Sequence, residues 1–192
     1  MKRSLIAALA LCAAPAVVLA QGGGFGIKGG LSYGNVSNNG ALPGNVAQRS
    51  GFAAGISLAT GGVIGFGVEG LYAQRGVTSN VAIDSHRLDY IDVPLYLRVA
   101  LPTPGISPFV YAGPQGSYEL KCGTDAGNCP DTGRPKVTYA GVIGAGLRIG
   151  KLAGVSVEGR YVYGLTDLKL NTVSTSTSYK TRSFMLLAGF SF

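Results

Sequence analysis

Apolar and other residues alternate along most of the chain. The clearest run spans residues 91–101. One face of this run carries Ile91, Val93, Leu95, Leu97, Val99 and Leu101, and the other carries Asp92, Pro94, Tyr96, Arg98 and Ala100. A period of two over eleven residues predicts a β-strand with one apolar side. About ten residues is also the length that a tilted strand needs to cross a bilayer.

The same alternation recurs in seven further segments, so the sequence predicts eight strands. These segments are residues 25–33, 52–58, 64–75, 110–119, 138–149, 155–165 and 184–192. The fifth strand in chain order has the weakest pattern, because Phe109 and Tyr111 fall on the face that otherwise carries polar residues.

The connections between these segments alternate in length. Residues 60–62, 102–107 and 151–154 form short turns, whereas residues 35–49, 76–87, 120–136 and 166–179 form long polar loops. Bacterial outer-membrane barrels have short turns on the periplasmic side and long loops outside. The predicted fold is therefore all-β, an eight-stranded antiparallel up-and-down transmembrane β-barrel. Its even strand number places both termini in the periplasm.

A soluble β-sandwich or lipocalin-like barrel is the alternative fold, with the apolar faces turned inward. Charges of both signs on the polar faces and aromatic residues near the strand ends favour the membrane barrel. A membrane helix fits less well. Residues 50–68 lack charge, but they contain six glycines and a turn-like Thr60-Gly61-Gly62 sequence.

The first twenty residues have the pattern of a secretory signal peptide. They begin Met-Lys-Arg, continue with an apolar core at residues 5–11 and end with small residues at 18–20. Pro15 and the glycines at 22–24 make a membrane anchor the weaker interpretation. The expected organisation is a signal peptide over 1–20 and an outer-membrane barrel domain over 21–192.

The composition points to lipid as the solvent. Only 13% of residues are charged, and 31 are glycine, whereas soluble domains carry about 25% charged residues. The net charge is +7, but the Lys and Arg residues are scattered singly. We therefore expect no nucleic-acid partner, and interpret the basic balance as weak attraction to anionic lipid head groups.

Two cysteines, Cys122 and Cys129, remain after signal cleavage, with six residues between them. In an oxidising compartment such a pair predicts a disulfide that closes a small loop. A metal site needs further ligands nearby, and the sequence offers none there, so no cofactor is expected.

The charged residues on the polar faces are the main candidates for a functional site. An eight-stranded barrel has an interior about wide enough for side chains to fill it. We expect arginine forks and carboxylates to pair there and plug the lumen. A gated ion path is the alternative. The candidates are Lys28, Glu69, Arg75, Asp92, Arg98, Glu119, Arg148, Glu158 and Arg160.

The end of the chain alternates up to a terminal aromatic residue. Its apolar positions include Phe184, Leu186, Phe190 and Phe192. The pattern resembles the terminal signature that the outer-membrane assembly machinery recognises, and this machinery is an expected partner. An ordinary amphipathic strand that happens to end in Phe is the alternative.

Two patterns with catalytic associations do not fit their usual context. Residues 65–70 match a dinucleotide-binding fingerprint, but they lie inside a predicted strand instead of before a helix. Ser85 and His86 invite comparison with a lipid hydrolase. As sequence neighbours in an extended segment, however, their side chains point in opposite directions. We expect a protein that is not an enzyme.

Four stretches resemble the small outer-membrane β-barrel family of Bacteroidetes, which is PorT-like and OmpA-like. They are GIKGGL at 26–31, EGLYAQRG at 69–76, YIDVPLYLR at 90–98 and EGRYVYGL at 158–165. The resemblance implies an eight-stranded barrel in the outer membrane and no known activity. The family's namesake takes part in protein secretion.

The leading interpretation of function is a barrel that serves envelope structure or binds partners. Expected partners are outer-membrane lipid, lipopolysaccharide, and secretion or envelope proteins. A narrow transport channel is the second interpretation, and a membrane-embedded lipid hydrolase is the third.

Overall fold

The computed structural model describes most of the chain after the predicted signal peptide. The described residues are 24–38, 46–79, 86–101, 103–124, 127–128, 135–150, 153–166, 168–172 and 175–192. The predicted signal peptide at 1–20 lies outside them, and its cleavage stays a prediction.

The described residues form ten β-strands. In chain order they are β1 (Gly24–Asn38), β2 (Val46–Ala59), β3 (Ile64–Ser79), β4 (His86–Ala100), β5 (Ile106–Thr124), β6 (Gly127–Asn128), β7 (Val137–Ile149), β8 (Gly154–Gly164), β9 (Leu168–Thr172) and β10 (Thr175–Ser191). Within this described part, no helix is long and apolar enough to span a membrane.

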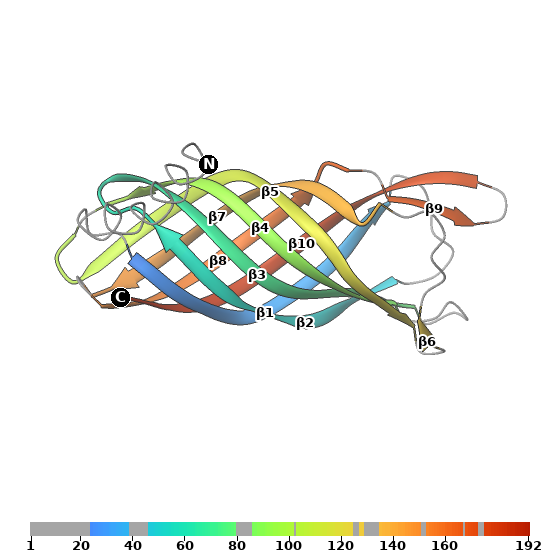
Figure 1. Ribbon diagram of the computed structural model, residues 1–192, viewed down its shortest axis with the longest axis horizontal. Coiled ribbons are helices and arrows are strands. Elements are labelled where there is room, and N and C mark those ends of the chain that lie inside the picture. The colour runs from blue at the N-terminus through green and yellow to red at the C-terminus, as the bar shows by residue number, and fades with distance from the viewer. Residues whose placement is uncertain are drawn as a thin grey trace, which may run out of the picture.

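Eight of these strands close into an antiparallel barrel (Figure 1). Neighbours pair in the order β1-β2-β3-β4-β5-β7-β8-β10, and β10 pairs with β1 from Gly26↔Ser191 to Asn38↔Tyr179. The short strands β6 and β9 pair only with β5 and β10. The predicted eight-stranded up-and-down barrel is confirmed.

The two ends of the barrel differ, and one prediction about them is wrong. Short turns join the strands at the end where β1 begins and β10 ends. At the opposite end, segments predicted as loops continue as paired strands, so that β1 reaches Asn38 and β5 reaches Thr124. The polar Asn, Ser and Thr residues in these segments suggested loops. Paired strands, however, are joined by backbone hydrogen bonds, which polar residues form as well as apolar ones.

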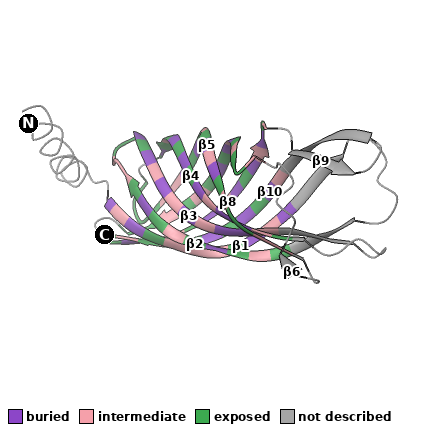
Figure 2. Ribbon diagram, turned by 45° about the vertical axis from the view of Figure 1, so that its right-hand side comes forward, coloured by how far each residue is buried: buried purple, intermediate pink, exposed green. Residues whose placement is uncertain are grey.

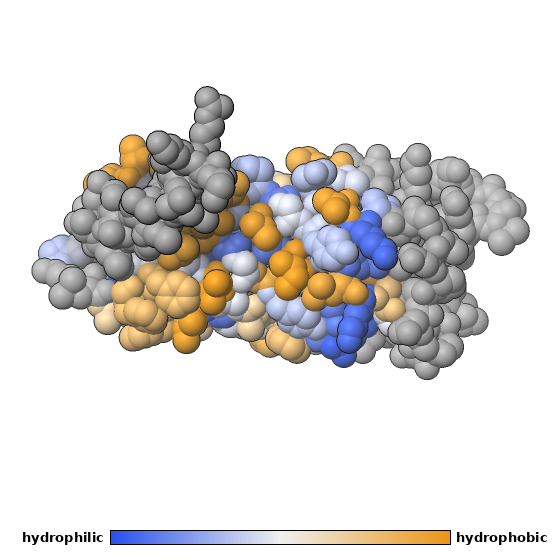
Figure 3. Space-filling model, in the orientation of Figure 1, coloured by the Kyte–Doolittle hydropathy of each residue, from blue (hydrophilic) through white to orange (hydrophobic). Residues whose placement is uncertain are grey.

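The outward face of the barrel is apolar. Figure 2 shows buried and exposed residues alternating along the strands, as the period of two predicts. Outward side chains such as Phe66 are widely exposed, at 68%. On the face shown in Figure 3, strongly hydrophilic side chains gather toward the end that carries β6 and β9. Since a monomeric soluble protein rarely exposes so much continuous apolar surface, this belt is suited to lipid.

The inner face holds large aromatic rings as well as charges. Phe109 and Tyr111, which weakened the sequence pattern of the fifth strand, point inward and are 7% and 3% exposed. They fit because glycines face them on β7. A Cβ on Gly144 would lie 2.3 Å from Cζ of Tyr111, and one on Gly146 would lie 2.6 Å from Cζ of Phe109. Wall glycines therefore make room for rings inside a narrow barrel.

Candidate functional site

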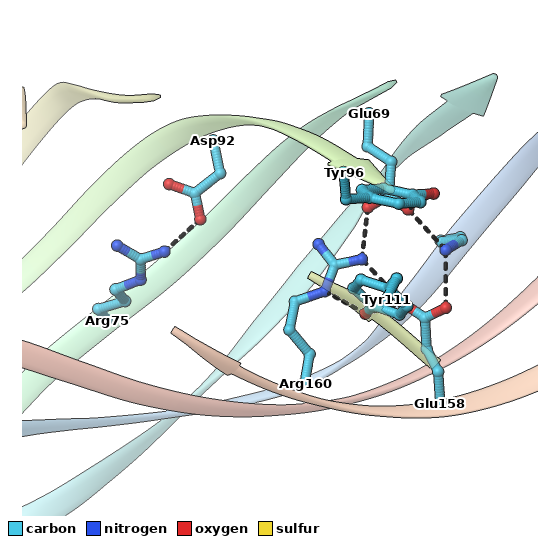
Figure 4. Close-up of polar contacts among 8 residues, drawn as sticks. Glu69, Arg75, Asp92, Tyr96, Tyr111, Glu158 and Arg160 are labelled. Atoms are coloured by element: carbon cyan, nitrogen blue, oxygen red, sulfur yellow. Dashed lines mark hydrogen bonds and ion pairs between the residues drawn. The ribbon is translucent and has the colours of Figure 1, made fainter. Parts of the chain in front are cut away.

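Four charged side chains meet in the lumen and form an ion-pair tetrad (Figure 4). Lys28 comes from β1, Glu69 from β3, and Glu158 and Arg160 from β8. Lys28 Nζ donates to Glu69 Oε1 at 2.6 Å and to Glu158 Oε2 at 2.8 Å. Arg160 Nη2 donates to Glu69 Oε2 at 2.5 Å and to Glu158 Oε1 at 2.8 Å. Each cation thus bridges both carboxylates across the barrel.

Two tyrosines from β4 and β5 brace the tetrad (Figure 4). The Tyr96 hydroxyl of β4 donates to Glu69 Oε1 at 2.7 Å. The Tyr111 hydroxyl of β5 donates to Glu158 Oε1 at 3.0 Å and accepts from Arg160 Nε at 2.8 Å. Gly67 makes room for Tyr96, since a Cβ there would lie 2.3 Å from the ring. The tetrad and its tyrosines therefore tie β1, β3, β4, β5 and β8 together.

The tetrad is almost fully removed from solvent, with Arg160 only 1% exposed. Burying single charges costs several kcal/mol each unless they are paired and hydrogen-bonded. Here two positive and two negative groups balance. Charge-assisted hydrogen bonds between them offset much of the desolvation cost.

An apolar layer lies next to the tetrad in the lumen. On β3, Leu71 and Ala73 follow Glu69 on the inner face, and on β8, Val162 follows Arg160. All members of this layer are buried. They are Ala53, Leu71, Ala73, Val142, Val162, Met185 and Leu187. These residues were not among the predicted site residues, although the same period of two assigns them to the inner face.

A separate ion pair lies toward the end that carries β6 and β9, and its Asp92 is the ladder partner of Leu71 from the apolar layer. Arg75 Nη2 of β3 donates to Asp92 Oδ2 of β4. The Arg75 guanidinium also lies 5.2 Å from the ring centre of Tyr90. Because β3 and β4 are neighbours in the sheet, this pair runs along the wall instead of crossing the lumen.

The other three predicted charges are Arg98, Glu119 and Arg148. Arg98 of β4 and Arg148 of β7 lie near the end with the short turns, where they line a common pocket. Glu119 lies on β5 opposite Tyr90, close to the other end. The nine candidate charges thus occupy several levels of the lumen instead of one network.

Several other sequence candidates stay predictions. Cys122 lies on β5, but Cys129 lies outside the described residues, so the disulfide is untested. Ser85 also lies outside them, and only the backbone of His86 is described. No group of three or more His, Cys, Asp or Glu side chains in the described ranges is arranged to hold a metal ion.

The terminal apolar residues lie on the lipid-facing side. Phe184, Leu186, Phe190 and Phe192 are all exposed on the outer face of β10 and the residue after it. The Phe192 ring packs edge-on against Phe25, with ring centres 5.4 Å apart. Their role as an assembly signal stays a prediction.

Comparisons with known proteins agree with this architecture. The model of the family described as "Outer membrane protein beta-barrel domain" matches residues 4–192. Among solved structures, the Neisserial surface protein NspA is 14% identical, with a TM-score of 0.52 and coverage of 88% of this chain and 97% of that one. OprG from Pseudomonas aeruginosa is 12% identical, with a TM-score of 0.52 and coverage of 88% and 96%.

A third similar structure is the outer membrane protein AlkL, determined in lipid bilayers. It is 17% identical, with a TM-score of 0.51, and the match covers 88% of this chain and 90% of that one. At these identities the likeness concerns the fold alone. No curated protein matches the sequence.

Proposed function

Because the chain belongs to the outer membrane protein β-barrel domain family and resides in the bacterial outer membrane, we propose that it is a closed, non-enzymatic barrel. It serves envelope structure or presents its outer end and its periplasmic end to partner proteins. The observation that carries this proposal is the buried tetrad, which fills the lumen with paired charges at a level where a channel needs open water.

Two sets of side chains support a closed lumen. The tetrad and its tyrosines span the barrel, and buried apolar side chains pack beside them. A cavity beside the tetrad, lined by Lys28, Tyr96 and Glu158 among others, holds only about 50 Å³. That volume has room for a few water molecules and not for a solute path. An interior of eight strands is narrow enough for side chains to fill it.

The outer surface supports lipid and lipopolysaccharide as the surrounding partners. The apolar belt matches the lipid-facing band of outer-membrane barrels. Arg87 and Lys121 are exposed near the end that carries β6 and β9. Since the short turns of bacterial barrels are periplasmic, this end lies outside the cell. Their charges suit the phosphates of lipopolysaccharide. A PorT-like role, in which the partners are secretion proteins, is a more specific version of this proposal. It rests on the four sequence motifs alone.

A narrow channel is the second candidate. The observation that favours it is an open pocket lined by Arg98 and Arg148 at the end with the short turns. In this alternative the tetrad is a gate that opens, and the paired charges separate to admit ions.

Solute efflux from liposomes distinguishes the two candidates. The mature chain is refolded into vesicles loaded with a small fluorescent anion or with glucose, and folding is checked by the heat-dependent gel shift of barrels. We expect efflux no faster than from protein-free vesicles. The control variant Arg87→Gln alters an exposed arginine far from the tetrad. Its efflux rate is expected to equal that of the unaltered protein. Rapid efflux with folded protein would refute the closed barrel and favour the channel.

A further inference from the structure

A pocket opens into the lumen at the end where β1 begins and β10 ends, and we call it the mouth pocket. Its volume is about 490 Å³. Its polar lining consists of Arg98, Arg148, Thr103 and Ser107, and the backbone of Gly62 and Gly150 completes the rim. This pocket lies outside the tetrad and plays no part in the closure proposed above.

The lining of the mouth pocket carries two positive charges, and neither of them is in an ion pair among the described residues. Among the described residues, neither Arg98 nor Arg148 takes part in an ion pair, and the lining of the mouth pocket contains no Asp or Glu. The Nε atoms of both are buried without a hydrogen-bond partner. Glu158, which lines a neighbouring cavity together with both arginines, is already bonded to Lys28, Tyr111 and Arg160.

The protein holds both arginines in place by contacts that leave their charge unmatched. The Arg98 guanidinium stacks over the ring of Phe109, 4.4 Å from its centre. Arg148 passes over Gly154, where a Cβ would lie 2.7 Å from the Arg148 Nε. A larger residue at 154 would displace the Arg148 side chain. Two like charges that line one pocket, neither of them in an ion pair, form an arrangement that can bind an anion.

We propose that the mouth pocket binds a small soluble dianion with carboxylate or phosphate groups, gripped between Arg98 and Arg148. Guanidinium forks match the two oxygens of either group. The pocket is larger than a single phosphate needs, which favours a molecule with two anionic groups. Ser107 lines the same pocket, whereas the Thr103 hydroxyl is already bonded to the Ile106 carbonyl. The site faces the periplasm, and it binds its ligand whether or not the barrel conducts.

The test uses the refolded mature chain in an uncharged maltoside detergent, with pyrophosphate and succinate as probes and chloride as the reference anion at equal ionic strength. Calorimetric titration measures binding, and the heat-dependent gel shift gives the unfolding midpoint. We expect saturable binding of a dianion and a rise in the midpoint that chloride does not cause. Arg98→Gln and Arg148→Gln are each expected to weaken binding at least about tenfold, because each removes charged hydrogen bonds.

Three comparisons distinguish anion binding at this site from a general effect of net charge. Without added anion, Arg98→Gln or Arg148→Gln is expected to raise the midpoint, since each relieves repulsion between like charges. The control Arg87→Gln removes one positive charge at the opposite end and must leave binding unchanged. Arg148→Lys keeps the charge but loses the fork, and is expected to bind more weakly than the unaltered protein.

The proposal is overturned if neither dianion binds saturably, if chloride acts equally, or if Arg87→Gln weakens binding as much as the two pocket variants. If one glutamine variant does not fold, the other and Arg148→Lys still decide the outcome. Efflux from liposomes is independent of this result, so failure of the site leaves the closed-barrel proposal standing.

Discussion

The tetrad and the Arg75–Asp92 pair are both buried ion pairs in the same lumen, yet they connect the barrel differently. The tetrad joins β1, β3 and β8, and its tyrosines add β4 and β5. The Arg75–Asp92 pair joins only β3 and β4, which already share a ladder of backbone hydrogen bonds. The tetrad therefore holds opposite walls together, whereas the pair reinforces a contact that exists without it.

This difference predicts how each set responds to substitution. In the tetrad each carboxylate depends on two cations, so that losing one cation affects both carboxylates at once. In the pair, each group has one ionic partner among the described residues, and Arg75 is also stacked on Tyr90. Loss of a tetrad member is expected to destabilise the barrel more than loss of a member of the pair.

The largest effect is expected for Arg160→Met. The change leaves Glu69 and Glu158 to share the single charge of Lys28 in a buried site, and breaking such a pair costs about 3–5 kcal/mol. Urea unfolding in lipid vesicles measures the loss. The double variant Glu69→Gln with Arg160→Met removes one charge of each sign and should recover part of the stability. Equal stability of Arg160→Met and the unaltered protein would contradict the account.

An intermediate effect is expected for Gly144→Ala. The added Cβ would lie 2.3 Å from the Tyr111 ring, and the ring must move away from Glu158 and Arg160. Such overpacking typically costs about 1–3 kcal/mol. The matched control is Gly141→Ala on the same strand, where a Cβ would meet nothing within 4 Å. The same unfolding assay compares them, and equal stabilities of the two variants would show that the tyrosine brace is unimportant.

A smaller effect is expected for Asp92→Asn in the wall pair. Asparagine keeps the shape and can still accept a hydrogen bond from Arg75, so the loss is about 1 kcal/mol. The corresponding tetrad change, Glu69→Gln, serves as the comparison in the same assay. If Asp92→Asn costs more than Glu69→Gln, then the wall pair and not the tetrad stabilises the lumen.

The smallest effect is expected for Arg87→Gln. Arg87 pairs with Asp89 at 3.1 Å, but the arginine is exposed. Exposed ion pairs contribute little because water and salt screen them. The unfolding midpoint should be indistinguishable from that of the unaltered protein, and added salt should change both equally. A clear loss would show that the outer surface stabilises the barrel in a way that the account omits.

Much of the fold was predictable because a period of two is a local property. The alternation from Ile91 to Leu101 assigns each residue to one side of the wall, and the exposed positions follow it. The strand number and the antiparallel order follow from counting such runs. The extension of β1 and β5 beyond the predicted strands was not visible, because backbone pairing outside the membrane leaves no hydrophobic signal.

The site was only partly predictable because it depends on the stagger between strands. The sequence assigns Lys28, Glu69 and Arg160 to the inner face, but only the register brings them to one level of the lumen. The register also brings Arg98 and Arg148 together in the pocket at the end with the short turns. The fit of Tyr111 over Gly144 couples residues on different strands, so no local pattern reveals it.

The most direct test of the closed lumen is ionic conductance in planar bilayers. The refolded mature chain is inserted at defined protein-to-lipid ratios, and its folded state is confirmed by the heat-dependent gel shift. Silent bilayers are expected with the unaltered protein, because the tetrad and the buried apolar side chains beside it fill the lumen. Discrete, reproducible channel steps from folded protein would contradict the closed lumen and would make the tetrad a gate.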